Sequence, residues 1–349
     1  MTLSTTRQAT APEILDRCRE LVRPALAESV RRLHPWHAET AAFSLGWSGV
    51  DGSPVPGSQG KGVRQALAVL GAEAAGGSGP DGVTGAVAVE LVHTFSLIHD
   101  DIMDGDETRR RRPTVWKAYG TGPAVLAGDA LFALAVSTLA EVPGPSGPAA
   151  VRRLSGALGD LVHGQAQDLL FESRPWTGPE AVLPHEYRAM AAQKTGSLLG
   201  CSAALGAVLA GAPAATADAL DRAGRHLGVA FQAVDDLLGI WGDPQLTGKP
   251  VHSDLRRLKK TLPVLAALSS RHPAARQLEA VLTGADPLDG AGLRRTAGLV
   301  DEAGGRRATV AEAREHLRAA RACLDGVDLA EGARGDLLTL IPFLVDRTG

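Results

Sequence analysis

Cysteines and aromatic residues are scarce in this sequence. The 349 residues include three cysteines, and only 4% are Phe, Trp or Tyr. Cys18, Cys201 and Cys323 are far apart, odd in number and without metal-ligand spacing. This argues against a disulfide framework and a zinc site, and it is typical of a reducing compartment. We therefore expect a cytoplasmic protein whose cysteines lie in the core.

A strong net charge and long apolar runs are also missing. The formal net charge is -3, and the basic residues are not interleaved with aromatic ones, so we expect no nucleic-acid partner. No run approaches 18 apolar residues without a charge or a helix breaker, so no transmembrane helix is predicted. The polar first dozen residues also lack the apolar core of a secretory signal.

Hydrophobic residues make up 44% of the chain, enough for a sizeable core, and they recur at helical spacing. This pattern predicts an all-α protein with a flexible N-terminal tail over residues 1–12 and a single domain over residues 13–349. Helices are expected over 13–33, 34–47, 119–139, 149–171, 185–211 and 214–242, and glycine- and proline-rich loops over 47–62, 76–82, 173–184 and 242–263.

Residues 91–114, LVHTFSLIHDDIMDGDETRRRRPT, combine an apolar helix with a concentrated charge site. Asp100 and Asp104 share a helical face, with Asp101 beside them. Clustered carboxylates become favourable when Mg²⁺ lies between them, and Mg²⁺ usually takes one or two carboxylates plus phosphate oxygens. Four arginines follow at positions 109–112 and suit a diphosphate. This pattern therefore predicts a phosphorylated ligand.

A solvated helix end followed by a surface basic run is the alternative interpretation of residues 91–114. The flanking residues disfavour it, because Leu91 to Met103 are apolar nearly all round the helix and predict a buried helix. Carboxylates on a buried helix need partners.

Three weaker signals accompany this stretch. Lys61 and Arg64 lie where a glycine-rich loop opens a helix, which favours anion binding, although exposed charges are commoner there. His93 is seven residues before Asp100 on nearly the same helical face. It is interpreted either as a ligand-binding histidine or as a core histidine. The segment 164–168, GQAQD, is a site wall or a solvent-facing polar stripe.

The acid-then-base arrangement recurs about 135 residues later. The helix expected over 214–242 ends in FQAVDDLLGIWGDP, where Gln232 and Asp235 are neighbours on one face. The loop after it carries Lys249, Asp254 and Lys259 among other charges. We predict that the two acidic sites face each other across one cavity and bind a metal-bridged diphosphate from both sides.

These motifs, in this order, resemble those of the trans-isoprenyl diphosphate synthases, the polyprenyl synthetase family, over residues 25–345. The resemblance implies an isoprenoid-synthase-type helical bundle around a central active-site cavity, and a homodimer. The matching segments are GKGVR, DDIMD with its downstream arginines, GQAQDL, KTG, FQAVDDLLG and GKP…SDLRRLKKTLP.

The resemblance also implies roles for the matching residues. Asp100 and Asp104 would bind two of three Mg²⁺ ions with support from Asp101, and Asp235 would bind the third. Isopentenyl diphosphate would be held by Lys61, Arg64, His93 and Arg110. The allylic diphosphate and its cavity would be assigned to Arg109, Lys194, Thr195, Gln232, Lys249 and Lys259.

The implied reaction is a Mg²⁺-dependent prenyl transfer. The allylic C–O bond ionises as charge on the leaving diphosphate is stabilised, and the double bond of isopentenyl diphosphate attacks the carbocation. The released diphosphate takes the proton in this family. A class I terpene cyclase and a noncatalytic partner subunit on the same fold are the alternatives. The second diphosphate site argues against the cyclase.

Product length follows from the helix before the first acidic motif. Ser96 lies one turn before Asp100 on the same face, and Phe95 lies roughly 7.5 Å from Asp100 along the axis. One aromatic residue at Phe95 with a small Ser96 resembles the producers of geranylgeranyl diphosphate (C20), which we expect, with farnesyl diphosphate (C15) second.

The sequence departs from the family pattern at a few positions. Gly239 replaces the third Asp of the second acidic motif, which weakens the outer shell of that metal site. Asp243 or Asp254 could compensate. Arg111 takes the place of a common Gly. Gly239 is also the only hint of a noncatalytic subunit.

Overall fold

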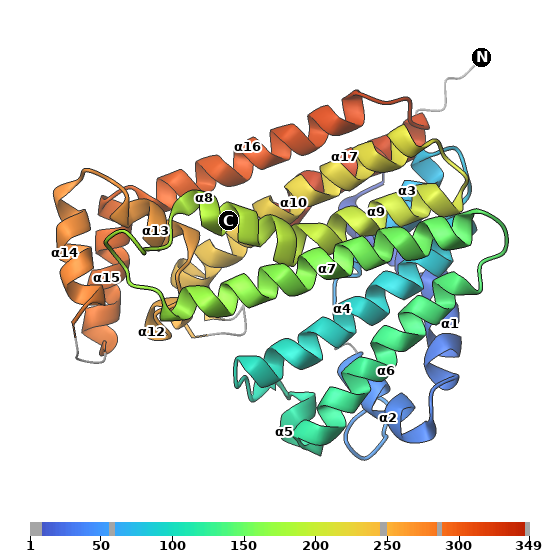
Figure 1. Ribbon diagram of the computed structural model, residues 1–349, viewed down its shortest axis with the longest axis horizontal. Coiled ribbons are helices and arrows are strands. Elements are labelled where there is room, and N and C mark those ends of the chain that lie inside the picture. The colour runs from blue at the N-terminus through green and yellow to red at the C-terminus, as the bar shows by residue number, and fades with distance from the viewer. Residues whose placement is uncertain (1–8, 56–59, 245–249, 285–287, 346–349) are drawn as a thin grey trace. The chain divides into compact units, whose positions relative to one another are not determined.

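Helices dominate the computed structural model, which describes residues 9–55, 60–244, 250–284 and 288–345 (Figure 1). The only strands in these ranges are β1 (Thr108–Arg109) and β2 (Arg112–Pro113), a short antiparallel pair. The predicted all-α fold is confirmed. The first eight residues of the predicted tail lie outside the described residues, and the first helix begins at Ala11.

The chain divides into two compact units. The first comprises Met1–Gly156, Cys201–Asp221 and Leu324–Leu340, and the second comprises Ala157–Gly200, Arg222–Cys323 and Ile341–Gly349. The single domain expected over residues 13–349 stays a prediction.

The helices of the N-terminal part of the chain belong to the first unit. They are α1 (Ala11–Arg31), α2 (Pro35–Ser44), α3 (Val63–Ala74), the 3₁₀ turn η1 (Gly79–Gly82), α4 (Val83–Met103), α5 (Val115–Tyr119) and α6 (Thr121–Ala140).

Within the described ranges, six further elements belong wholly to the second unit, and five longer helices have residues in both. The six are α8 (Pro184–Ala191), the π-helical turn η2 (Ala192–Gly196), α12 (Ser253–Arg256), α13 (Leu262–Leu268), α14 (Pro273–Leu282) and α15 (Gly290–Glu302). The five are α7 (Ser146–Ser173), α9 (Ser197–Leu209), α10 (Ala214–Trp241), α16 (Gly305–Asp325) and α17 (Glu331–Val345).

Helix α4 is the central core element of the first unit and lies beside α6 (Figure 1). Leu91, Val92 and Ile98 are at most 1% exposed, because they face the neighbouring helices. Met103 at the end of α4 is 45% exposed. The prediction of a helix buried nearly all round is therefore right for its middle and wrong for its last turn, which carries the acids.

Two stretches are long and apolar enough to cross a membrane by length and composition: Gly79–Met103 and Thr121–Ala140. Residues buried within the structure make up 56% of the first window and 39% of the second. Since α4 and α6 pack against each other, part of this apolar surface serves the core. The absence of a transmembrane segment stays a prediction.

One continuous helix was expected over residues 185–211, but a π-helical turn interrupts it between α8 and α9. Two close backbone approaches surround this turn. A Cβ atom on Gly164 of α7 would lie 2.4 Å from the Lys194 nitrogen, and one on Gly228 of α10 would lie 2.3 Å from the Gly196 Cα. Only glycine permits this packing, and π-helical turns often occur at functional sites.

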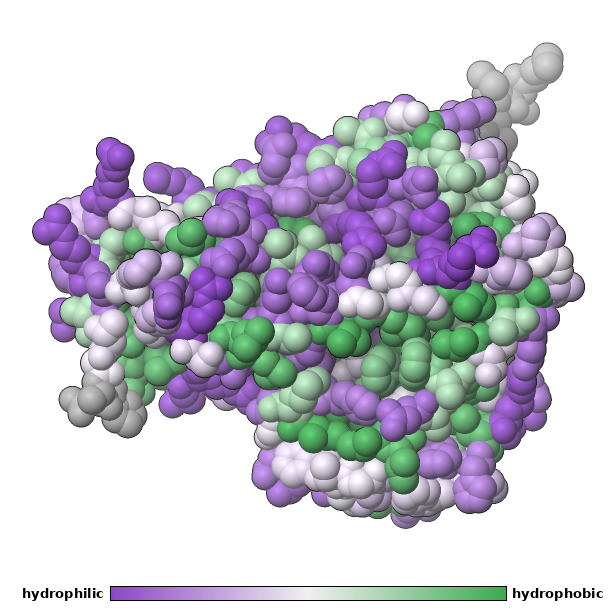
Figure 2. Space-filling model, viewed as in Figure 1, coloured by the Kyte–Doolittle hydropathy of each residue, from purple (hydrophilic) through white to green (hydrophobic). Residues whose placement is uncertain are grey.

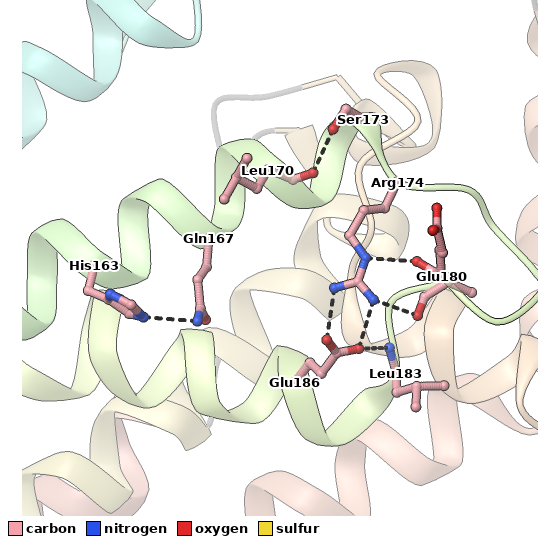
Figure 3. Close-up of polar contacts among 9 residues, drawn as sticks. His163, Gln167, Leu170, Ser173, Arg174, Glu180, Leu183 and Glu186 are labelled. Carbon is pink, nitrogen blue, oxygen red and sulfur yellow. Dashed lines mark hydrogen bonds and ion pairs between the residues drawn. The ribbon is translucent and has the colours of Figure 1, made fainter.

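Arg174 fixes the loop between α7 and α8 (Figure 3). Its guanidinium donates to the carbonyl oxygens of Glu180 and Ala181, both at 2.8 Å, and to both carboxylate oxygens of Glu186, at 2.8 and 3.1 Å. Glu186 also accepts the Leu183 N–H over 2.9 Å, which caps the start of α8. One side chain thus connects the loop to the helix that leads into the π-helical turn.

We expect Arg174→Ala to lower the free energy of unfolding by about 1–3 kcal/mol, because it removes charge-assisted bonds and leaves two carbonyls without their donor. Urea denaturation followed by circular dichroism measures this. Arg31→Ala is the matched control, since within the described part of the chain Arg31 forms its ion pair with Glu28, three residues away, and its side chain is 71% exposed. This control should lower the free energy of unfolding by less than about 0.5 kcal/mol. Equal losses in both variants would contradict the role of Arg174 in fixing the loop.

Candidate active site

The first acidic motif lies at the C-terminal end of α4. Asp100 and Asp104 are half-buried and one helical turn apart, and Asp104 is the C-cap residue. Asp101 is only 4% exposed and faces inward. The helix therefore separates two acids at the surface of the site from one beneath it.

Asp101 is paired with Arg109. The guanidinium donates to Asp101 Oδ1 from Nε at 2.9 Å and from Nη2 at 2.7 Å. Burial raises the pKa of Asp101, and these bonds oppose that rise. The pair fixes the Arg109 guanidinium against Asp101, with the charge of Asp100 also acting on it. The supporting role of Asp101 in metal binding stays a prediction.

The arginine run forms a tight hairpin. Arg109 pairs with Arg112 across β1 and β2, and Arg110 and Arg111 form the turn with φ values of 51° and 63°. A turn that is left-handed at both positions favours Asn-Gly, because larger residues clash there. The strained turn points the side chains of neighbouring arginines in different directions.

Arg112 has a structural role. It donates to the carbonyl oxygens of Ser48 at 2.5 Å and Phe43 at 3.3 Å, and its guanidinium lies 4.7 Å from the centre of the Phe43 ring. It therefore anchors the segment after α2.

Three of the residues assigned to isopentenyl diphosphate come together in the first unit. Arg64 Nη1 lies 3.2 Å from His93 Nε2. Arg110 and His93 line one pocket, and a Cβ atom on Gly60 would lie 2.9 Å from Arg110 Nη2. Lys61, next to Gly60, is exposed. His93 therefore connects two arginines that the sequence signals suggested separately, since Arg64 contacts its ring and Arg110 lines the same pocket.

His93 is neutral in this environment. A guanidinium can only donate, so the His93 Nε2 accepts and the ring proton lies on Nδ1. Burial and the charges of Arg64, Arg110 and Arg109 lower the pKa of His93 well below its usual value. Burial also raises the pKa of Glu90, one turn earlier on α4, against the opposing charge of Arg64.

Helix α1 supplies pocket residues that the sequence did not point to. Arg19 also donates to the Lys61 carbonyl oxygen over 3.3 Å, which ties α1 to the glycine-rich loop. No spacing signal connects residues so far apart in the sequence. The pocket is lined by Arg19, Arg23, Leu26, Ser44, Leu45, Trp47, Gly60, Gln65, Glu90, His93, Thr94, Leu97 and Arg110.

The second unit brings together several other predicted site residues. Lys194, in the π-helical turn, donates to Asp168 Oδ2 of α7 over 2.6 Å. Thr195 Oγ1, next to it, donates to Gln232 Oε1 of α10 over 2.9 Å. The KTG, GQAQDL and FQAVDD segments are therefore brought into contact.

Asp236 was not predicted as a site residue, but it is the centre of a buried network. Its carboxylate accepts the Tyr187 hydroxyl at 2.6 Å, the Leu262 N–H at 2.8 Å and Gln232 Nε2 at 3.1 Å. Burial raises the pKa of Asp236 to about 7, and these bonds oppose the rise. Asp236 therefore fixes the Gln232 side chain, while the preceding Asp235 is half-buried on α10.

Gln165 of α7 is 7% exposed, and neither of its amide atoms has a hydrogen-bond partner among the described residues. The solvent-facing interpretation of the GQAQD segment is wrong for this residue. A buried amide without partners is costly and is typical of a place where water or a ligand binds. The signal in the sequence was the group of two amides and an acid, Gln165, Gln167 and Asp168, on a predicted helix.

Lys259 is half-buried, and its N–H donates to the Asp254 carbonyl oxygen over 2.9 Å. Lys249 lies outside the described residues, so its predicted role stays a prediction.

The acids fit Mg²⁺ by their chemistry. Among the described residues no group of three or more His, Cys, Asp and Glu side chains could hold a metal ion alone. Asp100 and Asp104 instead offer two hard oxygen ligands on one helical face, as Mg²⁺ requires when phosphate oxygens complete its shell. Their roles and those of the other predicted site residues stay predictions.

Known proteins with similar sequences and structures belong to one family. A family model described as Polyprenyl synthetase matches residues 55–297. A (2E,6E)-farnesyl diphosphate synthase from Mycobacterium bovis is 44% identical over 96% of this chain and 92% of its own. A geranylgeranyl diphosphate synthase from Mycobacterium tuberculosis is 46% identical over 89% and 88%. The crystal structure of a polyprenyl synthetase from Streptomyces coelicolor A3(2) superposes with a TM-score of 0.89 at 47% identity and covers 95% of this chain and 98% of its own.

We expect Arg111→Gly to raise the free energy of unfolding by about 0.5–1 kcal/mol, because glycine relieves the left-handed turn. Arg111→Ala is the matched control, since it removes the same side chain but keeps the unfavourable φ. Urea titration of both variants separates backbone strain from side-chain contacts. Equal stabilities of the two would show that the turn stores no strain.

His93 should make stability depend on pH. Below about pH 6.5 the unfolded chain binds a proton at this position and the folded chain does not, so stability is present above that pH and falls as pH decreases. Wild type should therefore lose stability relative to His93→Gln between pH 6.5 and 5, by at most about 1.4 kcal/mol per pH unit. Urea midpoints measure this, with the exposed His185→Gln as control. Parallel wild-type and His93→Gln curves would contradict a neutral His93.

Proposed function

Since this chain belongs to the polyprenyl synthetase family and is a short-chain prenyl diphosphate synthase, we propose that it condenses isopentenyl diphosphate with an allylic diphosphate to give geranylgeranyl diphosphate. The observation that carries this proposal is the pairing of two different cationic sites. The cluster of Arg64, His93 and Arg110 suits one diphosphate, and Arg109 beside the α4 acids suits another.

By the family resemblance, the allylic diphosphate would be held by residues of both acidic motifs. Asp100 and Asp104 would hold two Mg²⁺ ions and Asp235 a third, and these ions would neutralise charge on the diphosphate as its C–O bond breaks. Arg109, with Lys194 and Lys259, would bind diphosphate oxygens, and Lys249 is assigned with them by the resemblance. Asp101 would keep Arg109 oriented, and Asp168 would do the same for Lys194.

The bond electrons would leave with the diphosphate, and a delocalised allylic cation would remain. Thr195 and Gln232 would line its cavity, because their mutual bond and the Asp236 network fix them in place. The double bond of isopentenyl diphosphate then forms the new C–C bond, and the released diphosphate accepts the proton. Exclusion of water protects the cation during this step.

The isopentenyl diphosphate would be held by Lys61, Arg64 and Arg110, with the neutral His93 donating through Nδ1–H. Because Arg110 and Arg64 remain charged while His93 does not ionise, the pocket keeps its charge over the physiological pH range. This second diphosphate site argues against a terpene cyclase, which holds one diphosphate only.

The length of the product would be set by the Phe95 ring. It lies 4.9 Å from the His99 ring in an edge-to-face arrangement and 5.7 Å from the Phe132 ring of α6. These contacts fix it as a wall. Ser96 is small, and its hydroxyl donates to the His93 carbonyl oxygen over 3.0 Å. The small side chain of Ser96 together with a wall at Phe95 supports C20, and C15 is the second candidate.

We also propose a homodimer in the cytoplasm. Helix α6 exposes Val125, Leu126 and Phe132 by 38, 50 and 39%, and Figure 2 shows apolar side chains gathered over this helix. An exposed apolar patch favours a protein contact. The scarcity of cysteines supports the compartment.

The proposal is tested by incubating purified protein with Mg²⁺, labelled isopentenyl diphosphate and dimethylallyl, geranyl or farnesyl diphosphate, and sizing the dephosphorylated products. We expect a C20 product from wild type, C15 from Ser96→Phe because the wall moves closer, and C25 or longer from Phe95→Ala because the wall is removed.

Val50→Ala, at a 51% exposed position, is the control and should give the wild-type product. A C15 product from wild type would keep the chemistry and refute the Phe95 wall. No incorporation from any starter would refute the synthase proposal for this chain.

A further inference from the structure

Gly239 is the position at which the second acidic motif lacks its third carboxylate. It lies four residues after Asp235, so a side chain there would be on the same face of α10, one turn closer to the helix end. The residue itself is buried. Another group must therefore fill the place of the missing carboxylate.

The Asp254 carboxylate fills it. A Cβ atom built on Gly239 would lie 1.9 Å from Asp254 Oδ2 and 2.4 Å from its Cγ. Real Cβ atoms essentially never come within 3.0 Å of such atoms. A side chain at position 239 and the Asp254 carboxylate in its observed place are therefore mutually exclusive.

Several contacts seat α12 on the end of α10. His252 Nδ1 donates to the Ile240 carbonyl oxygen over 2.6 Å, and Ser253 Oγ donates to the Gly239 carbonyl oxygen over 3.3 Å. Carbonyls of a last helical turn have no partner within the helix, so these bonds satisfy them. Leu255 is 1% exposed and packs in one cluster with Ile240. Asp254 therefore belongs to a docked element.

Asp254 is also oriented by its neighbours. Ser253 Oγ lies 3.2 Å from Asp254 Oδ1 as a donor, and the Asp254 carbonyl oxygen accepts the Lys259 N–H at 2.9 Å. The same backbone segment thus positions one carboxylate and the lysine assigned to the allylic diphosphate. Asp243, the other candidate, is exposed beyond the end of α10.

We propose that Asp254 supplies the carboxylate that position 239 lacks and supports the Mg²⁺ ion held by Asp235. This rests on the proposed function and deepens it: Asp254 acts as a positioning residue for the second metal site. Gly239 is then a steric requirement for Asp254.

The test moves the carboxylate from position 254 to position 239. Calorimetry with Mg²⁺ and inorganic diphosphate as probes compares wild type with Asp254→Asn, Asp254→Ala, Gly239→Asp and the double variant Gly239→Asp/Asp254→Ala. Asp254→Asn should weaken Mg²⁺-dependent diphosphate binding at least about tenfold, as loss of an outer carboxylate does. Gly239→Asp should weaken it too, because it displaces Asp254. The double variant should bind at least about threefold better than Asp254→Ala.

Asp243→Asn is the matched control and should bind as wild type does. Unchanged binding by Asp254→Asn, or a folded double variant no better than Asp254→Ala, would overturn the role of Asp254. Thermal unfolding shows which variants are folded, and if the double variant is not, Asp254→Asn against Asp243→Asn decides. A wild type that binds no diphosphate with Mg²⁺ would overturn the proposed function as well.

Discussion

Carboxylates on half-buried helix faces must be balanced by cations or donors, and the organisation of both units follows from this requirement. In the first unit Asp101 is balanced by Arg109. In the second, Lys194 balances Asp168, and neutral donors surround Asp236. The acids that are satisfied within the protein hold Arg109, Lys194 and Gln232 in place.

Backbone geometry does the remaining positioning. The left-handed turn at Arg110 and Arg111 points adjacent arginine side chains in different directions. In the π-helical turn, the consecutive residues Lys194 and Thr195 have partners on different helices. Both devices are locally unfavourable. Neighbouring contacts hold both turns in place. The Arg112 bonds to the α2 segment support the arginine turn, and the close approach of Gly164 and Gly228 to the π-helical turn supports that turn.

The helices and the position of the two acidic motifs on them could be predicted, because helical periodicity and charge spacing are local properties of the sequence. The π-helical turn could not, since it depends on glycines of α7 and α10 that are far from residue 194 in sequence. The same holds for Arg19 and Arg23, which reach the His93 pocket only through the packing of α1. The network around Asp236 could not be predicted either, because it depends on Tyr187 and Leu262, which are far from Asp236 in sequence.

The substitution at Gly239 shows why a motif should be judged in three dimensions. A site that was decaying would leave an empty space where a side chain had been lost. Here the space at Gly239 is occupied by a carboxylate of the same chemical type, delivered by a short helix that also satisfies the last carbonyls of α10. The glycine and the Asp254 carboxylate are complementary in shape, so the second acidic motif is a composite of two segments. This geometry argues against a noncatalytic subunit, for which Gly239 was the only indication.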